Sequence, residues 1–347
     1  MTFQWPESTP VNMVCQKKWF ETDDTVSVLI APENNPKGFD FKPGQFISLG
    51  LEIDGKTEYR AYSISSLPKQ TAIQLTIKRV DSGKVSNHIV DSLNPGDVVS
   101  VLRPAGSFNS IDNVPKRKVA LISAGCGITP VMSMSKQWLA KQDDMDINFI
   151  HMAKSPEKTI YFDELEQLDR EFDQFDLKLL LKDAKQSKHP QGRLDSQWLT
   201  TLCDDILERS VYLCGPVQFM QDMENNLRDL GFDMAHFYQE SFTPIQTELN
   251  SEDEPQAANS TVTLSVPAFD KEVELENGAT LVDALESAGL PIIVACRSGI
   301  CGSCKCKVTK GEVVSTSQGA LTAEDIKQGY VLACSSKVQS DVEVELG

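Results

Sequence analysis

The chain carries the stretch Cys296-Arg297-Ser298-Gly299-Ile300-Cys301-Gly302-Ser303-Cys304, and Cys334 follows thirty residues later. Three thiols in one glycine-rich loop and a fourth from a separate segment match the C-x4-C-x2-C…C spacing of plant-type [2Fe-2S] centres. Gly299 and Gly302 allow positive φ and close backbone approach, so amide N–H groups can point at the bridging sulfides. The spacing predicts a cluster held by Cys296, Cys301, Cys304 and Cys334, and therefore an electron-transfer protein.

The alternative is a structural zinc site, because Cys306 adds another thiol close to this loop. Zinc motifs usually present two cysteine pairs separated by a longer spacer, whereas here three thiols share one loop and Cys334 stands alone. The iron–sulfur interpretation is therefore favoured. Cys306 is expected on a strand at 305–309, as a free thiol and not as a ligand.

Composition limits the classes of partner. At 347 residues the chain is long enough for about two to three domains. The formal net charge of −17 disfavours nucleic acid and anionic membranes; it suits docking to a basic patch on a redox partner, or simply a well-solvated surface. Nine cysteines without a signal peptide indicate metal or redox use in a reducing compartment, so a cytoplasmic protein is expected.

The N-terminal part of the chain has the pattern of a small antiparallel barrel. Short apolar runs are punctuated by Pro43-Gly44, Asp54-Gly55 and Asn94-Pro95-Gly96. The strands are expected at 26–30, 45–50, 60–65, 73–79 and 97–102, with one helix at 86–92.

From Lys116 the pattern changes to strands that alternate with helices. Strands are expected at 118–123, 147–152, 177–181 and 210–213, and helices at 129–141, 162–172 and 217–230. Such alternation predicts a parallel sheet with crossover helices, which makes a second, α/β domain.

Residues 247–260, TELNSEDEPQAANS, are polar and acidic and are best interpreted as a linker. A hairpin at 262–266 and 271–275 and a helix at 280–288 precede the cluster loop, which predicts a small β-rich domain. The expected boundaries are 1–113, 114–245, 246–260 for the linker, and 261–347.

One strand of the barrel carries Arg60-Ala61-Tyr62-Ser63, and Gly83-Lys84-Val85-Ser86 later opens the only expected helix there. A glycine before a helix N-terminus leaves unpaired amides that favour a pyrophosphate. Arg60 offers a countercharge, Tyr62 a flat face for an isoalloxazine ring, and Ser63 a hydroxyl. Each fragment alone is weak, since similar residues form ordinary sheet surfaces and N-caps. Their order ahead of an α/β domain strengthens the signal.

The α/β domain contains two glycine turns. Its first strand ends in Ala124-Gly125-Cys126-Gly127-Ile128-Thr129-Pro130, where Thr129 suits an N-cap and Pro130 the first helical position. Its last expected strand ends in Cys214-Gly215-Pro216. Because α/β sheets bind nucleotides at the carboxyl ends of their strands, the two turns are expected to face one crevice.

Together these residues resemble the ferredoxin-NADP reductase superfamily, in which R-x-Y-S and G-x-x-S hold a flavin while G-x-G-[IV]-[TA]-P and C-G-P hold a nicotinamide dinucleotide. Within it, the stretches 60–66, 124–134, 242–244, 295–308 and 329–334 look most like the NADH-dependent reductase of the hybrid-cluster (prismane) protein. The resemblance implies an antiparallel β-barrel flavin domain, an α/β NAD(P)H domain and a C-terminal α+β, β-grasp-like [2Fe-2S] ferredoxin domain.

The resemblance also assigns residues. It implies FAD bound by Arg60, Ala61, Tyr62, Ser63, Ile77, Lys78, Arg79, Gly83, Val85, Ser86 and Asn87, and NADH bound by Gly125, Cys126, Gly127, Thr129, Pro130, Cys214, Gly215 and Pro216. Phe242 is expected to cover the flavin ring, although Phe237 and Tyr238 remain candidates for that role or for the core. NADH follows from resemblance alone, because Ala153-Lys154-Ser155 offers no acid for the ribose 2′-hydroxyl and Lys154 could accept a 2′-phosphate.

The expected function is an oxidoreductase that passes electrons from NADH through FAD and the cluster to a protein acceptor, the hybrid-cluster protein first. No general acid or base is expected. The nearest alternative is the reductase component of a Rieske-type oxygenase or demethylase, which shares this architecture. A third hypothesis is a non-enzymatic iron–sulfur carrier without a working flavin domain.

Overall fold

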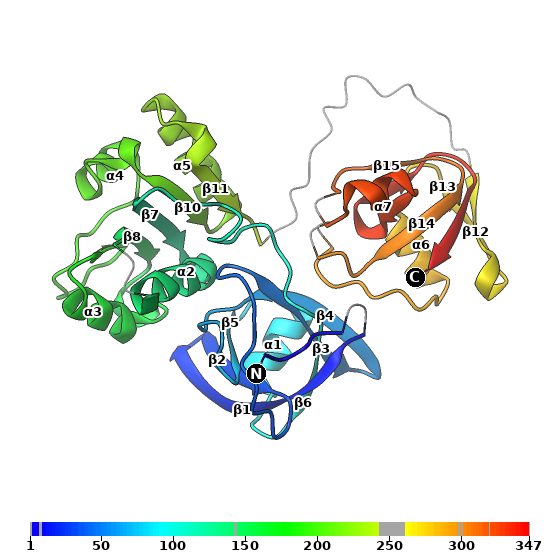
Figure 1. The fold of residues 1–347 in the computed structure, drawn as a ribbon, viewed down its shortest axis with the longest axis horizontal. Helices are drawn as coiled ribbons and strands as arrows, with labels where there is room; N and C mark the ends of the chain where they lie inside the picture. The colour runs from blue at the N-terminus through cyan, green and yellow to red at the C-terminus, as the bar shows by residue number, and fades with distance from the viewer. Residues whose placement is uncertain are drawn as a thin grey trace. The chain divides into compact units, whose positions relative to one another are not determined.

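The computed structural model describes residues 2–6, 9–141, 144–242, 261–297, 299, 301–318 and 320–346, and Figure 1 draws it as a ribbon. Residues 1–47 and 62–243, which make up the α/β domain and most of the N-terminal barrel, form one compact unit. The C-terminal domain belongs to a second unit. The predicted linker, 246–260, lies outside the described residues.

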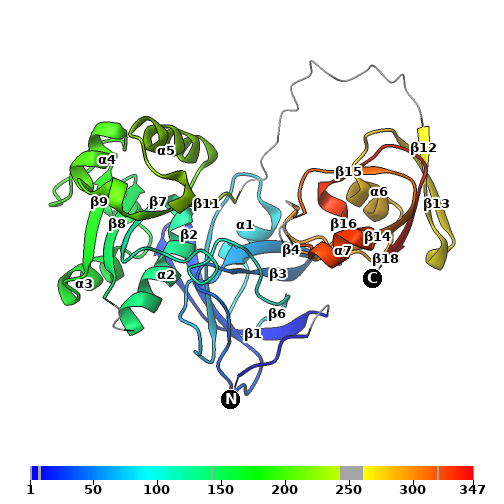
Figure 2. The ribbon, with the colours of Figure 1, turned by 45° about the horizontal axis from the view of Figure 1, so that its top comes forward.

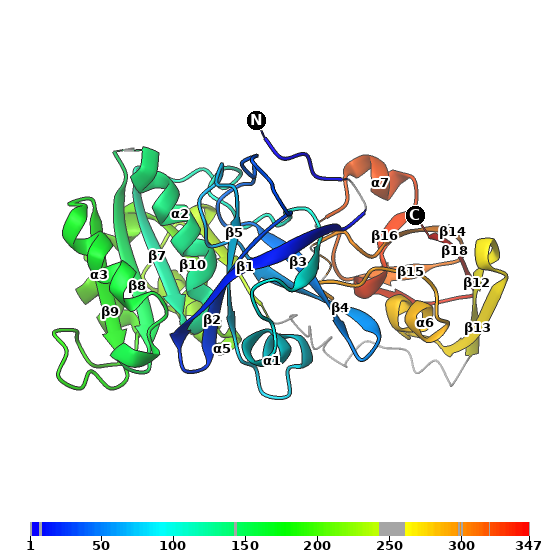
Figure 3. The same ribbon diagram turned by 90° about the horizontal axis from the view of Figure 1, so that it is seen from below.

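The N-terminal domain is a six-stranded antiparallel sheet with the order β4-β3-β6-β1-β2-β5. The sheet closes where Ile64, directly after β4, pairs with Leu75 of β5, which makes the predicted barrel (Figure 3). A single helix, α1, Lys84–Asp91, follows β5. The strands are β1 Val11–Thr22, β2 Thr25–Ala31, β3 Phe46–Ile53, β4 Lys56–Ser63, β5 Ile73–Lys78 and β6 Val98–Val101.

Strand β1 was absent from the sequence prediction although it is central in the sheet and twelve residues long. Its pairing with β2 shifts register between Cys15 and Lys17 and again between Phe20 and Thr22. Such bulges break the two-residue alternation of apolar side chains that identifies a half-buried strand.

The second domain is a parallel sheet with the order β11-β10-β7-β8-β9. Apolar clusters fill both faces, one against α2 and α3 and the other against α4 and α5 (Figure 1). The elements are β7 Lys118–Ala124, η1 Gly125–Gly127, α2 Ile128–Lys141, β8 Asp146–Ala153, η2 Pro156–Lys158, α3 Phe162–Glu171, β9 Phe175–Leu181, α4 Ser196–Leu202, η3 Ile206–Glu208, β10 Ser210–Cys214, α5 Val217–Asp229, η4 Met234–His236 and β11 Phe237–Glu240. The sequence pattern did not predict α4 or β11.

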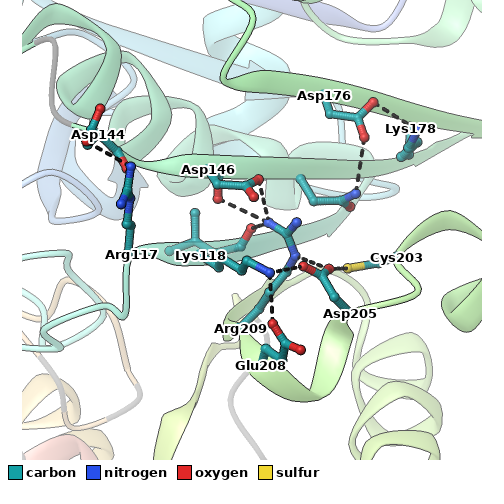
Figure 4. A network of polar contacts seen from close by, with 12 residues as sticks. Arg117, Lys118, Asp144, Asp146, Asp176, Lys178, Cys203, Asp205, Glu208 and Arg209 are labelled. Carbon is teal, nitrogen blue, oxygen red and sulfur yellow. Dashed lines mark hydrogen bonds and ion pairs between the residues drawn. The ribbon is translucent and has the colours of Figure 1, made fainter.

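A buried arginine ties together the amino-terminal ends of these strands (Figure 4). Arg209 donates to Asp205 Oδ1 at 2.5 Å, to Asp146 Oδ1 at 2.9 Å and to the carbonyl of Val119 at 3.0 Å. Lys118 donates to the same Asp205 at 2.9 Å. Burial alone raises the pKa of Asp205, but hydrogen bonds from Arg209 and Lys118 outweigh it and hold that pKa at about 2.

The C-terminal domain is a five-stranded mixed sheet with the order β13-β12-β18-β14-β16, in which β12 and β18 are parallel. Helix α6 lies against this sheet and buries Leu281 and Leu285 in its core (Figure 2). The α+β arrangement agrees with the predicted ferredoxin-like fold. The elements are β12 Thr261–Val266, η5 Pro267–Phe269, β13 Lys271–Glu276, α6 Leu281–Ser287, β14 Lys305–Lys310, β15 Val313–Ser315, α7 Ala323–Lys327, β16 Tyr330–Leu332, η6 Ala333–Ser335, β17 Ser336–Val338 and β18 Val342–Leu346.

Among the described residues, no helix is both long enough and apolar enough to cross a membrane.

Candidate electron-transfer site

The predicted flavin motif lies at the end of strand β4. The Ser63 side chain is buried, and its Oγ has no hydrogen-bond partner among the described residues. Arg60 donates from Nη1 to the carbonyl of Tyr59 at 2.6 Å, and its side chain is 43% exposed. Ala61 and Tyr62 are half-buried. A buried hydroxyl without a partner is costly, so Ser63 fits a position that a bound polar group completes.

The turn into α1 supplies backbone amides. Ser82 takes φ 58°, and Gly83 in extended conformation precedes the helix without offering a side-chain cap. No side chain caps this helix start, and a helix N-terminus favours an anionic acceptor. Val85 and Ser86 are buried, and within the described residues Asn87 Oδ1 is another buried acceptor without a donor. This cradle fits the pyrophosphate or ring edge of a flavin dinucleotide.

The side chains of the predicted β5 contacts are used elsewhere. Ile77 is fully buried in the barrel core. Lys78 Nζ donates to both oxygens of Asp24, at 2.8 and 2.7 Å, while Arg79 is paired with Asp91 on α1. A flavin contact from this strand would therefore come from its backbone.

The first glycine turn differs from the prediction at the helix start. Gly125–Gly127 already forms a 3-10 turn and α2 begins at Ile128, so Thr129 is not the N-cap. Its hydroxyl donates to the carbonyl of Cys126 at 3.1 Å. Pro130 still lies in the first turn, where its missing N–H has no cost. The prediction was wrong because the 3-10 turn already leads into the helix before Thr129 is reached, with Gly125 at φ 56°.

The two glycine turns lie against each other, as expected. A Cβ added to Gly127 would stand 2.1 Å from the carbonyl oxygen of Cys214, so only glycine permits this approach. Cys214 is buried, and Pro216 precedes α5. Burial raises the pKa of the Cys214 thiol and raises that of Cys126 to about 11, so both stay protonated.

Glu240 was missed by sequence reasoning. It ends β11 in register with Cys214, and its Oε2 is buried with no partner in the described part of the chain. Burial raises the pKa of this carboxyl to about 8. The sequence feature that could have identified Glu240 is an acidic residue at the carboxyl end of a strand beside the Cys-Gly-Pro turn. Recognising it requires knowing that β11 pairs with β10. The residue places a neutral carboxyl next to the second glycine turn.

The three aromatic candidates separate clearly. The Tyr238 ring lies 5.0 Å from the Tyr212 ring, centroid to centroid, and Phe237 packs against an apolar cluster of the sheet. Both belong to the core. Phe242 is 47% exposed beyond β11, which leaves it available to cover a ring.

The predicted cluster loop has the backbone that a buried anion requires. Gly299 and Gly302 take φ 71° and 76°, as predicted, and Arg297 takes φ 52°. A Cβ on Gly299 would lie 2.6 Å from Cβ of Ser317, so the loop admits no larger residue there. Arg297 pairs with Asp283 and Glu286 of α6 and thereby fixes the loop to that helix.

The four thiols gather in one place. The backbone N–H of Cys334 donates to Cys304 Sγ at 3.5 Å. Cys301 and Cys334 donate to the neighbouring Cys296, which raises the thiol pKa of both, whereas a hydrogen bond from Cys334 lowers the pKa of Cys304. Crowding of this kind fits a polynuclear cluster that needs all four as thiolates.

The arrangement of the thiols favours the iron–sulfur cluster over zinc. Three thiols come from one loop and Cys334 comes from a separate segment, whereas zinc sites usually use two cysteine pairs. Cys306 is fully buried on β14 in the apolar core, and burial raises its thiol pKa to about 12, as suits a free core thiol.

Three known domain families match the chain. An oxidoreductase FAD-binding domain covers residues 13–110, an oxidoreductase NAD-binding domain covers 121–225, and a 2Fe-2S iron-sulfur cluster binding domain covers 268–339. Fold and site therefore define a flavin-dependent oxidoreductase with an NAD-binding domain and a [2Fe-2S] domain.

Full-length relatives place it further. The chain is 36% identical to the glycine betaine monooxygenase reductase subunit of Pseudomonas aeruginosa, with 95% of this chain and 94% of the relative covered. It is 33% identical to the NADH oxidoreductase HCR of Escherichia coli, with 98% of both covered. Phthalate dioxygenase reductase has the same fold, with a TM-score of 0.63 at 22% identity over 97% of this chain and 98% of that one. The chain belongs to the ferredoxin-NADP reductase superfamily, among its three-domain iron–sulfur reductases.

Proposed function

We propose that this protein is the reductase component of an oxygenase system. It takes electrons from NADH and delivers them singly to the oxygenase. FAD held in the barrel domain would supply the conversion of a two-electron hydride from NADH into two single electrons for the cluster, with NAD+ and one proton as the other products. The full-length similarity to a monooxygenase reductase subunit carries the choice of acceptor.

The residues of this chain have distinct tasks in that scheme. Ser63, Asn87 and the uncapped N-terminus of α1 hold FAD, and the paired turns at Gly127 and Cys214 hold the dinucleotide. Three buried polar atoms support this assignment, because Ser63 Oγ, Asn87 Oδ1 and Glu240 Oε2 have no partner among the described residues. Each is satisfied when the cofactors complete the site.

The cluster ligands we propose are Cys296, Cys301, Cys304 and Cys334. A decisive test mixes the protein anaerobically with NADH or NADPH and follows flavin bleaching and the paramagnetic signal of the reduced cluster. NADH should bleach the flavin first, then the cluster. Reduction by NADPH alone would contradict the donor, and zinc without a paramagnetic signal would contradict the cluster.

The variant Cys334→Ser separates the two halves of the relay. It removes one of the four proposed thiolates, so the cluster signal should be lost while NADH still bleaches the flavin. Cys306→Ser is the matched control, because Cys306 is a core thiol on the neighbouring strand. Loss of the signal in Cys306→Ser but not in Cys334→Ser would exchange the two assignments.

The acceptor is tested by competition. Reduced protein is mixed with the oxygenase subunit of a glycine betaine monooxygenase or with the hybrid-cluster protein, and acceptor reduction is timed. Faster reduction of the oxygenase is expected. The hybrid-cluster protein remains the second candidate, on the 33% identity to an NADH oxidoreductase over nearly the whole chain; faster reduction of it would reverse the choice.

A further inference from the structure

Tyr161 has an unusual position at the start of α3. It takes φ 61° and ψ 29°, a left-handed conformation that bulky residues rarely adopt, and it is only 3% exposed. A strained backbone of this kind persists only where the surroundings fix it. What fixes Tyr161 is a contact across the boundary between the α/β domain and the barrel.

The Tyr161 hydroxyl begins a chain of buried hydroxyls that runs into the barrel. It is hydrogen-bonded to Oγ1 of Thr76, which is 2.6 Å from Ser27 Oγ, and Ser27 in turn lies 2.5 Å from Oε1 of Glu21. The Glu21 carboxylate can only accept, and each hydroxyl has one proton. Ser27 therefore donates to Glu21, Thr76 to Ser27, and Tyr161 to Thr76.

Thr76 also holds the first glycine turn. Its backbone carbonyl accepts from Cys126 Sγ at 3.7 Å. Thr76 of β5 thus bonds both the first glycine turn and Tyr161, the residue before α3. The next residues on the strand, Ile77 and Lys78, are those expected beside FAD. Thr76 therefore lies where the first glycine turn, α3 and the expected flavin strand meet.

Other contacts between the barrel and the α/β domain lie close to the Tyr161–Thr76 hydrogen bond but do not replace it. Ser133 of α2 donates to the carbonyl of Ser66 at 3.0 Å. Lys136 Nζ lies 5.5 Å from the centre of the Tyr161 ring and pairs with Glu164 at 2.7 Å. The ring can therefore stay seated when its hydroxyl is removed, which makes Tyr161→Phe a clean probe. Burial raises the phenol pKa more than hydrogen bonds with Ser65 and Thr76 lower it, so the hydroxyl keeps its proton. Ser65, which directly follows Ile64 in the barrel, is thus a second cross-domain partner of the same hydroxyl.

We propose that Tyr161 is a positioning residue whose hydroxyl bond to Thr76 sets the spacing between the dinucleotide turn and the flavin strand. The inference rests on the proposed function for its kinetic consequence. Hydride transfer requires reacting atoms about 3 to 3.5 Å apart, and a displacement of about 1 Å can cost up to about a hundredfold in rate. A single cross-domain bond can therefore affect the rate without affecting cofactor binding.

The test compares Tyr161→Phe, Thr76→Val, their double variant and Ser27→Ala. Tyr161→Phe should keep its flavin and its Kd for NADH within about twofold, but lower the hydride-transfer rate constant about tenfold in stopped flow. Thr76→Val should lower the rate constant in the same direction but no further, because the hydrogen bond with Ser65 remains, and the double variant should be no slower than Tyr161→Phe. Ser27→Ala is the control. It removes the acceptor of the Thr76 hydroxyl proton, but Thr76 Oγ1 can still accept the hydrogen bond from the Tyr161 hydroxyl.

A second readout needs no cofactor. Hydrogen exchange of the amides in 125–131 and 74–78 should accelerate in Tyr161→Phe and not in Ser27→Ala. Unchanged exchange and unchanged hydride transfer would overturn the proposal, as would an additive double variant or equal damage from Ser27→Ala. If wild-type protein is not reduced by NADH, the proposed function fails, and the exchange result still decides whether Tyr161 joins the domains.

Discussion

Replacing the buried carboxyl at the end of β11 by an amide, Glu240→Gln, should change how stability depends on pH. Burial raises the pKa of Glu240 from an ordinary 4.5 to about 8. Between these pH values the folded domain keeps a proton that the unfolded chain has lost. Unfolding then becomes easier as pH rises through this window. The variant cannot ionise and lacks this loss.

The magnitude follows from linkage. Each pH unit in the window lowers the free energy of unfolding by about 1.4 kcal/mol, so the full shift corresponds to about 5 kcal/mol as an upper bound. Wild type and Glu240→Gln should be nearly equal in stability below pH 4.5. At pH 8 the variant should be more stable by a few kcal/mol.

Hydrogen exchange of the β10 amides under increasing urea, without NADH, measures the stability of this domain alone. Glu224→Gln is the matched control, because the ionisation of Glu224 should change the stability of the domain with pH in the opposite direction. Hydrogen bonds from Arg228 and Gln239 lower the Glu224 pKa, so wild type gains stability above the ordinary pKa and loses it as pH falls. A difference between wild type and Glu240→Gln that stays flat from about pH 5 to 8 would show an ionised carboxylate and refute the burial argument.

Three further substitutions test the scaffold and the two loops. Arg209→Ala leaves buried acceptors without their donor and should cost about 3 to 5 kcal/mol in urea unfolding of the α/β domain; a loss below about 1 kcal/mol would mean that water replaces the guanidinium. Gly127→Ala drives a methyl group into the carbonyl of Cys214, so the Kd for NADH should rise about tenfold with flavin content unchanged, as titration would measure. Gly299→Ala forces a strained φ and a clash with Ser317, so iron content and the reduced-cluster signal should fall, and full cluster loading would contradict the packing described here.

Much of the architecture was predictable because its signals are local. A thiol spacing, a glycine that must take positive φ and the change from two-residue to helical periodicity can each be read within a short stretch. The cluster loop, the glycine turns at Gly127 and Gly215, and the three-domain order followed from such stretches. The bulged β1 escaped prediction because its two register shifts destroy the alternation on which the local signal depends.

The tertiary structure decided everything that depends on which distant segments become neighbours. Glu240 is an ordinary acid in the sequence and becomes a buried neutral carboxyl only because β11 pairs with β10 beside Cys214. Lys78 meets Asp24 only because β5 pairs with β2, and Tyr161 meets Thr76 only where the α/β domain packs on the barrel. Burial and hydrogen bonding are properties of the assembled surroundings, so a linear pattern carries the chemistry of a side chain but not its partners.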